Sequence, residues 1–519
     1  MEIKTDVSYL KNTKCSDVYT ESQTDYILPD YLGDMRKILF TDATLRPSGR
    51  FAGGDEVEFS GVVVYNVIYL DSEGALSSAE FTSDYDYTVK CSGESYNDSI
   101  ANTRVSNYAV RLIGPRKISA RASLVGSVRL SENSTISVSG SAFEGDSAPE
   151  INRGSLKIRA SRTSSVVERE YAEALTRLDG AIADEVSVVY PNVEISVDDI
   201  RADEDSVTLK GKIRMCAMIK NGDEAAYSAE KQVSFEEKLD FDGADSMLCL
   251  IPQLSVCSVK ASVNADEGGC EVVISGIAEL CVIGEGNQSV DVMLDGYLKD
   301  CPTDNSYEDM KYTRLVSASC QKLNHNCEIS RADLESEGLR EIIFLTATPK
   351  TERVELEDGW AKICGEIRFS GIASEMIGDK ISYAGIKFSS PFEENVNINC
   401  QNSDNLRVEA DVKAQSCSAT LDADKLYTSC TLDCSVVALE DGSCRTLSSM
   451  TRREGESYES RESVVTVYYP TDSDTLFSVA KRFHTSGLKV ARDNDISDAV
   501  FAADNPMGSL VGVKKLIIF

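Results

Sequence analysis

The feature that most constrains the fold of this chain is a long internal repeat of alternating apolar residues. Three stretches, which contain Gly61, Gly211 and Gly365, carry apolar side chains at nearly every second position. The three glycines are separated by 150 and 154 residues, and each stretch is followed by a turn and a second alternating run. Alternation with a period of two on both sides of a turn is typical of a β-hairpin. The sequence therefore predicts three copies of one β-rich unit.

A strand upstream of the hairpin repeats as well, because residues 36–44 resemble residues 340–348. These two segments are separated by 304 residues, which is also the distance between the first and the third glycine. We therefore expect β-rich repeats at 30–148, 178–290 and 334–446. The predicted fold class is mainly β, with three tandem β-sandwich-like repeats that each bury one strand face, followed by a small α+β domain.

The segments between the repeats show other patterns. Residues 452–462 are polar and charged without apolar periodicity, which is typical of a flexible tether. A helix is predicted at 164–178, because apolar residues recur there at helical spacing, namely Val167, Tyr171, Leu175 and Leu178. The expected segments outside the repeats are an N-terminal segment at 1–29, a linker with a helix at 149–177, a connection at 291–333 and a polar linker at 447–463.

The last 56 residues, 464–519, show the order strand, helix, helix, strand. Asp474 lies where a helix N-cap is expected, and Gly487 is expected to end the first helix. A second short helix is predicted to run to about Asn494, and residues 516–519 close the unit as a strand. The first helix presents one apolar stripe, formed by Leu476, Val479, Ala480 and Phe483.

This terminal segment resembles a LysM domain. Residues 473–476 match the Gly-Asp-Thr-Leu turn of that family, except that Ser473 replaces the glycine. Asn494 ends the second helix as in the family, whereas Phe519 replaces the usual closing proline. The other matching positions are Val479, Ala480, Gly512, Leu516 and Ile518.

The resemblance implies a ligand groove between the loop before the first helix and the turn after the second. The implied partner-binding or glycan-binding residues are Asp472, Ser473, Asp474, Thr475, Asn494, Asp495 and Ile496. A purely structural interpretation stays open, in which Asp474 only caps the helix and Leu476 only fills the core.

Repeated β-rich units followed by one LysM-like segment form a recognisable order. Together with the strand at 61–69 and the run at 116–122, this order resembles the SPOCS-domain proteins of anaerobic spore-forming bacteria, in particular the SipL-like spore morphogenetic proteins. The resemblance implies a non-catalytic scaffold of the spore coat in the mother-cell cytosol, at the forespore surface. It also implies that the LysM domain binds a protein partner, the ATP-hydrolysing coat morphogen SpoIVA.

The charge distribution separates the terminal segment from the rest. The chain has 53 Lys and Arg against 85 Asp and Glu, a formal net charge of −32. Such an acidic surface repels polyanions, which excludes a general nucleic-acid binder. Residues 464–519 hold six basic and six acidic residues, so the whole net charge lies in residues 1–463.

The residues that usually carry catalysis are scarce. The chain has two histidines, and it contains no phosphate-binding loop, no nucleophile elbow and no HExxH helix motif. His325 lies near Cys327, but further ligands at metal-binding spacing are not evident, and the acidic run 198–205 lacks the pattern of a calcium loop. The 16 cysteines contain no CxxC pair and are interpreted as buried free thiols in a reducing compartment. The sequence thus predicts no catalytic residue, no metal and no cofactor.

An alternative function is binding of N-acetylglucosamine chains in the peptidoglycan of the cell or spore wall. This function would require export. The first 15 residues lack the apolar core of a signal peptide, and no window approaches the roughly 18 apolar residues of a membrane span. We therefore expect a cytoplasmic protein without a membrane span. A hydrolase is the least favoured alternative, because the motifs are missing.

Overall fold

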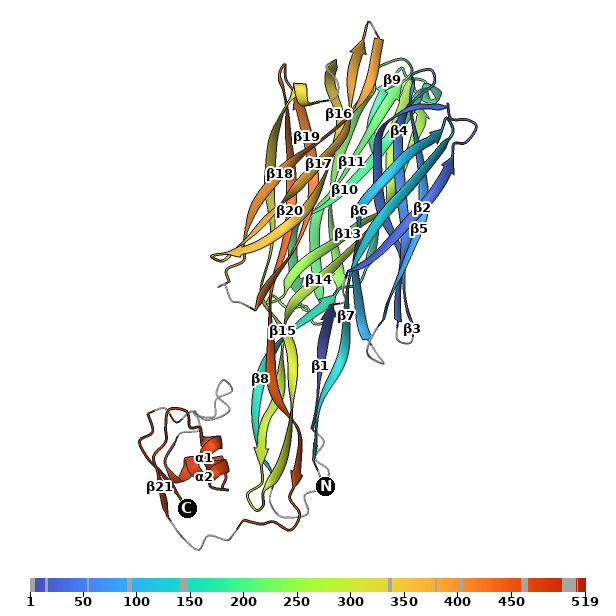
Figure 1. Cartoon of the computed structure of the whole chain (residues 1–519). Helices are drawn as coiled ribbons and strands as arrows, with labels where there is room; N and C mark the ends of the chain where they lie inside the picture. Colours follow the sequence, from blue (N-terminus) through green and yellow to red (C-terminus); the bar gives the residue numbers. More distant parts are fainter. Residues whose placement is uncertain are drawn as a thin grey trace.

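The chain is mainly β, as the sequence predicts. A computed structural model describes residues 5–14, 17–53, 56–90, 96–140, 148–334, 338–378, 380–400, 405–458, 465–496, 510 and 512–519. Long strands run along one direction of an elongated body, a narrower stalk extends from its lower end, and a small helical module lies beside the stalk (Figure 1). Two short 3-10 helices lie among the strands, at Ala183–Glu185 and Arg331–Asp333.

Three antiparallel three-stranded sheets form at the predicted repeats. In each, the strand that carries the repeat glycine is central. The nine strands are β3 (Met35–Gly53), β4 (Glu56–Asp71) and β5 (Leu76–Lys90), then β10 (Val186–Asp203), β11 (Ser206–Asn221) and β12 (Tyr227–Asp240), and then β16 (Leu339–Glu357), β17 (Trp360–Ile377) and β18 (Lys380–Asn397).

The repeat glycines make room for an aromatic ring on the neighbouring strand. Gly211 is in register with Phe235, and a β carbon at Gly211 would overlap the Phe235 ring and the Ser196 carbonyl oxygen. The other two repeat glycines pair in the same way, Gly61 with Tyr85 and Gly365 with Phe392. The recurring glycine is therefore required by close packing within the sheet.

A second antiparallel layer packs on each of these sheets. It consists of a strand that precedes the sheet and a hairpin that follows it, and its last strand is central. We call the resulting six-stranded assemblies unit 1, unit 2 and unit 3. The second layers are β2 (Val18–Ile27), β6 (Tyr96–Gly114) and β7 (Lys117–Gly140) in unit 1, β9 (Val167–Asp179), β13 (Cys249–Asp266) and β14 (Gly269–Tyr297) in unit 2, and β15 (Thr303–Ser330), β19 (Leu406–Leu421) and β20 (Lys425–Arg452) in unit 3.

Each unit encloses its own apolar core between its two layers. In unit 1, Tyr65 and Val67 of β4 pack in one cluster with Ile118 and Leu124 of β7, all of them almost completely buried. Burial of one such aliphatic side chain contributes about 1.5–3 kcal/mol. Units 2 and 3 have corresponding clusters. The alternation in the sequence thus marks the face that points into each unit's core.

The three units meet at a common centre made of aromatic rings. The rings of Phe40, Tyr190 and Phe344 contact one another with centroid separations of 4.9–5.4 Å. These residues occupy equivalent repeat positions, separated by the same 150 and 154 residues as the glycines. Ile68, Met218 and Ile372 pair with them in register and join the same buried cluster. The central strands are therefore buried on both faces near this point.

The stalk is built from extensions of the last strand of each unit. Beyond the cores, β7 pairs with β1 (Thr5–Lys14), β14 pairs with β8 (Glu150–Thr163), and β20 pairs with the first half of β15. These three ribbons leave the body together (Figure 1). A small apolar cluster of Met293, Leu447 and Met450 joins the second and third ribbons.

The helix predicted at 164–178 is wrong, because residues 164–166 form the connection between β8 and β9 and the rest of the segment lies in the strand β9. Val167, Tyr171 and Leu175 are four residues apart, a spacing that places side chains on one face of a strand as well as on one face of a helix. A bulge at Leu175, between the pairs Val272/Thr176 and Val273/Ala174, then shifts the phase. Leu178 therefore also faces the core of unit 2.

Segments that the sequence places between the repeats also form strands. The expected linker 149–177 contains β8 and most of β9, and the expected connection 291–333 contains β15. The polar linker 447–463 begins with the end of β20, and its residues 459–463 lie outside the described part of the chain. Arg453 is held by an ion pair to Asp304, 2.7 Å long, so this part of the expected tether lies against the stalk.

Candidate functional site

The terminal module has the predicted order of strand, helix, helix, strand. Its elements are β21 (Thr466–Tyr468), α1 (Leu476–Arg482), α2 (Gly487–Asp493) and β22 (Leu516–Ile518). The two strands pair antiparallel, and both helices lie in the connection between them. Leu476, Val479 and Ala480 of the predicted stripe are buried in the core of the module, and Phe483 is partly buried there.

The start of α1 differs from the prediction by one residue. Thr475, not Asp474, is the N-cap: its hydroxyl accepts a hydrogen bond from the Ser478 amide, and the Ser478 hydroxyl accepts one from the Thr475 amide. This reciprocal capping box satisfies two amides that a helix leaves unpaired. Gly487 does not end α1 either; α1 ends at Arg482, and Gly487 begins α2. The residue with a left-handed backbone between the two helices is His484, whose φ is 55°.

Asp474 organises the turn before α1 instead of capping the helix. Its carboxylate accepts hydrogen bonds from the Thr471 amide at 2.8 Å, the Thr471 hydroxyl at 2.9 Å and the Tyr468 hydroxyl at 2.8 Å. The bond from the Thr471 amide, followed by that from Tyr468, lowers the pKa of Asp474. Asp474 and Thr475 are thus both held by local hydrogen bonds, while Asp472 and Ser473 are exposed at the tip of the turn.

In the turn after α2, two of the predicted site residues make structural contacts and one is exposed. The side-chain amide nitrogen of Asn494 donates to the carbonyl oxygens of Val490 at 2.8 Å and Ile517 at 2.7 Å. Its side-chain oxygen accepts from the backbone amide of Ile517 at 2.6 Å. Ile496 packs against the module core, and Asp495 is exposed. The turn before α1 is held through Tyr468 of β21, and the turn after α2 is held through Ile517 of β22. Both turns therefore lie beside the same two-stranded sheet.

Asn494→Ala is expected to destabilise the module by about 2 kcal/mol, because three side-chain hydrogen bonds are lost, two of them to Ile517 of β22 and one to Val490 of α2. Asp493→Ala is the matched control, since Asp493 is an exposed residue at the end of α2, and we expect a change within about 0.5 kcal/mol. Hydrogen exchange of the amides in α2 and β22 of the full chain measures both effects. Equal protection in the two variants would contradict the structural role of Asn494.

The module is docked on the stalk through α1 and the turn that follows it. Tyr297, at the end of β14, is 3% exposed, and its hydroxyl donates to the Thr485 carbonyl oxygen at 2.6 Å. Its ring meets Phe477 edge to face at 5.3 Å, and Lys481 forms an ion pair of 2.5 Å with Asp295. The sequence offers no repeat or motif at Tyr297, so pattern reasoning could not find it. This contact leaves the tip at Asp472 and Ser473 exposed.

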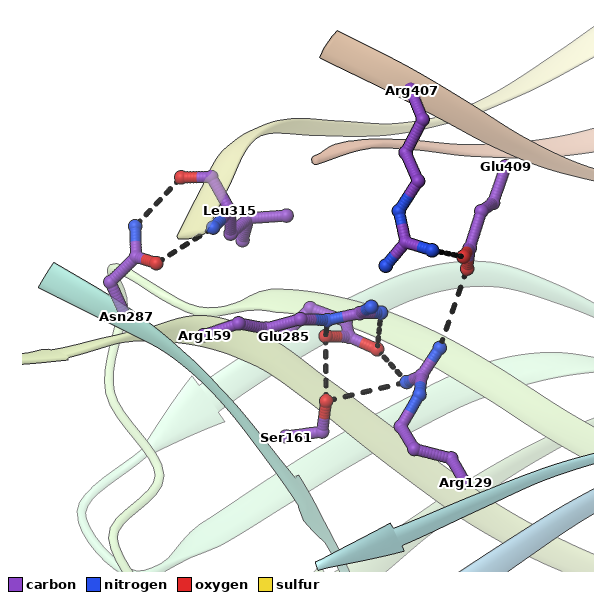
Figure 2. A network of polar contacts seen from close by, with 8 residues as sticks. All are labelled: Arg129, Arg159, Ser161, Glu285, Asn287, Leu315, Arg407 and Glu409. Atoms are coloured by element: carbon purple, nitrogen blue, oxygen red, sulfur yellow. Dashed lines mark hydrogen bonds and ion pairs between the residues drawn. The ribbon is translucent and has the colours of Figure 1, made fainter. Parts of the chain in front are cut away.

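A buried ionic cluster joins the three units where the body meets the stalk (Figure 2). Glu285 of β14 is 1% exposed and accepts hydrogen bonds from Arg159 at 2.9 and 3.0 Å and from Ser161 at 2.7 Å. Arg129 of unit 1 also pairs with Glu285, and its other nitrogen lies 3.8 Å from Glu409 of unit 3. The cluster therefore ties all three units together at one point.

The electrostatics of this cluster make it structural rather than catalytic. Burial by itself would raise the pKa of Glu285, but the ion pairs with Arg129 and Arg159 outweigh it and hold the pKa of that carboxyl below its usual range. A carboxylate saturated by donors is a poor general base. Next to the cluster, the Asn287 side chain clamps the backbone of Leu315, accepting from its amide and donating to its carbonyl oxygen, both at 2.8 Å.

The remaining sequence candidates make ordinary polar contacts. His325 lies in β15, with its Nδ1 3.6 Å from a carboxylate oxygen of Glu394. In the acidic run, Asp198 pairs with Lys212 at 3.2 Å and Asp199 pairs with Arg201 at 2.8 Å. Within the residues that the structure describes, no group of three His, Cys, Asp or Glu side chains is arranged to hold a metal ion.

Comparison with known proteins returned no match to any family model, curated protein or solved structure. In the described ranges, none of the helices has the length and apolar character that crossing a bilayer requires. The site is therefore defined by its own geometry, as an exposed polar turn on a module that is anchored to a three-unit body.

Proposed function

We propose that the protein is a non-catalytic assembly scaffold of the spore coat, in which units 1 to 3 are tandem SPOCS repeats and the terminal module is a LysM domain. The observation that carries this proposal is the arrangement of the module: one side is anchored to the stalk through Tyr297, and the tip at Asp472 and Ser473 faces outward. Such an arrangement presents a docking surface at a fixed place on a large body.

The use of buried polar groups supports a scaffold over an enzyme. The carboxylates of Glu285 and Asp474 are each engaged by several donors, which lowers their pKa values and leaves them poor proton acceptors. The three-ring centre at Phe40 and the ionic cluster at Arg129 both serve to hold units together. The polar contacts of these two carboxylates thus hold elements together, as an assembly protein needs.

The charge distribution supports docking of a protein through the module. The body carries the net charge of −32, and the module is neutral, so a partner can approach the module without a strong field while the acidic body resists self-association. We propose a SpoIVA-like coat morphogen as the partner and the mother-cell cytosol at the forespore surface as the location. The peptidoglycan alternative would use the same turn and is an outcome of the test below.

Asp472→Arg is expected to reduce capture of the partner by the full chain from sporulating cells at least tenfold, because it places a long cation on the exposed tip. Asp309→Arg is the matched control, since it makes the same charge change at an exposed position on the stalk strand β15. A chain ended after Arg452, where β20 ends, should capture none. Mass spectrometry of the bound proteins measures each result.

Two outcomes would contradict the proposal. Capture of the same proteins by the chain ended after Arg452 would show that the module is not the docking element. Binding of the full chain to purified peptidoglycan, abolished by Asp472→Arg and unchanged by Asp309→Arg, would favour the wall-binding alternative.

A further inference from the structure

The terminal module carries an apolar face that is exposed to solvent. In its two-stranded sheet, Val467 of β21 is in register with Ile517 of β22, and both neighbours of Ile517 in the chain are buried in the module core. Because successive side chains of a strand point to opposite faces, the side chains that share a face with Val467 and Ile517 lie on the outer side of the sheet. They are Val465 (54% exposed), Val467 (51%), Tyr469 (70%) and Phe519 (62%), together with the partly buried Ile517. We call this surface the outer sheet face.

The outer sheet face points away from the stalk. The opposite face of the sheet packs on the helices, and α1 contacts the stalk through Phe477 and Lys481. The helices therefore lie between the stalk and the sheet, with β21 on the far side (Figure 1). The tip at Asp472 and Ser473 is a separate surface, because its turn is held by the Tyr468 hydroxyl from the inner side of the sheet.

The charge distribution indicates which molecule can cover this face. Residues 1–463 carry the whole net charge of −32, so two bodies repel each other, whereas the module sums to zero. Lys514 and Lys515 precede β22 and are exposed, so they stay solvated at the edge of a contact, and the face itself consists of apolar side chains. Such a face is complementary to itself, since a two-fold arrangement places apolar side chains against apolar side chains. A second copy can therefore approach through the module without the repulsion that its body meets elsewhere.

From these observations we propose that the outer sheet face packs against the same face of a second copy and forms a symmetric dimer. This inference does not depend on the proposed function. In such a contact each sheet covers the other, and the two sheets lie about 10 Å apart. The exposed area of the apolar side chains is about 500 Å² per copy, so a dimer buries about 1,000 Å², which is the lower limit for a specific interface. We therefore expect a reversible dimer that forms at micromolar concentrations.

The dimer should become stronger as salt is added. The contact is apolar, and salt screens the repulsion between two bodies that each carry a charge of −32. The dissociation constant of the dimer should therefore fall when the concentration of sodium chloride rises from about 50 to about 500 mM. A contact made by exposed ion pairs would respond in the opposite direction, because salt weakens the attraction between exposed charges.

Sedimentation velocity of the full chain between about 1 and about 100 μM tests the proposal. We expect a monomer–dimer equilibrium, and Val467→Glu should weaken the dimer by at least about tenfold because the new carboxylate would be buried in the contact. Val166→Glu is the matched control, since it makes the same change at a position that is 60% exposed, in the connection between β8 and β9. It should leave the equilibrium unchanged, although both variants add one negative charge.

Hydrogen exchange of the wild-type chain at the two ends of this concentration range locates the contact without any variant. Amides in 465–469 and 516–519 should exchange more slowly at the higher concentration, while amides in β8 and β9 should not change. This measurement keeps the test decisive if Val467→Glu impairs folding of the module.

The inference is wrong if the chain stays monomeric over the whole range, if Val467→Glu leaves the dimer intact, or if the protection that depends on concentration lies outside the outer sheet face. A dimer that weakens with salt would also overturn it. Capture of a different protein by a monomeric wild-type chain, lost in Val467→Glu, would assign the face to that protein instead of a second copy. Asp472→Arg tests the tip separately, so the proposed function can hold where the dimer fails.

Discussion

Phe40→Ala is expected to lower the free energy of unfolding by about 3–5 kcal/mol, which is the range for truncation of a buried phenylalanine. The Phe40 side chain is 1% exposed and contacts both Tyr190 and Phe344, so its loss removes two of the three ring contacts at the centre of the body. The cavity that this truncation leaves would border all three units. We therefore expect weaker protection from hydrogen exchange in β4, β11 and β17 together.

Phe51→Ala provides the matched control for this prediction. It makes the same substitution on the same strand, β3, but the Phe51 side chain is 71% exposed. We expect a change within about 0.5 kcal/mol, as for most surface substitutions. Urea denaturation followed by circular dichroism compares the two variants. If their midpoints coincide, or if exchange increases in unit 1 alone, the three-ring centre does not hold the units together.

Glu285→Gln is expected to lower the free energy of unfolding by about 3–5 kcal/mol at neutral pH, because it leaves the buried Arg159 and the partly buried Arg129 without their shared counter-charge. Glutamine keeps the size of the side chain, so the effect reports the lost charge. The matched control is Glu328→Gln, since Glu328 forms an exposed ion pair with Lys425 on β15 and β20. Exposed pairs of this kind contribute about 0–1 kcal/mol.

The same residue predicts a pH dependence. The pKa of Glu285 in the folded chain is below its ordinary value of 4.5. Between the folded-state pKa and pH 4.5, the unfolded chain therefore binds more protons than the folded chain. The contribution of Glu285 to stability is complete above pH 4.5 and is lost as the pH falls through the folded-state pKa. We expect the stability difference between the wild-type chain and Glu285→Gln to shrink in acid. A difference in denaturation midpoint that stays constant with pH would contradict this.

The hairpins of the repeats could be predicted because their evidence is local. Alternation around Gly61, Gly211 and Gly365 identifies strands buried on one face, and the turns between them set the pairing. The terminal module could be predicted for the same reason, from the stripe that begins at Leu476. The error at Val167 to Leu175 shows the limit of this reasoning, because a spacing of four residues fits a strand and a helix equally well.

The candidate site could be predicted only in part. The sequence places Asp472 and Ser473 at an exposed turn and Asn494 at the end of α2, and the structure agrees with these positions. It could not distinguish Asp474 from Thr475 as the cap, since both residues are good caps and the choice depends on the hydroxyl of Ser478. The anchoring of the module by Tyr297 was out of reach, because the two partners are 188 residues apart in the chain.

The amino-acid sequence by itself determined the mainly β character, the threefold repetition and the order of elements in the terminal module. The β character and the order of elements follow from side-chain periodicity in short stretches where the period is unambiguous, and the repetition follows from comparing such stretches along the chain. Only the tertiary structure decided that Phe40, Tyr190 and Phe344 share one centre and that Arg129, Glu285 and Glu409 form one ionic cluster. Those contacts depend on how completed units pack against one another. The periodicity of a strand identifies which of its faces is buried, but it does not identify the residues that cover that face.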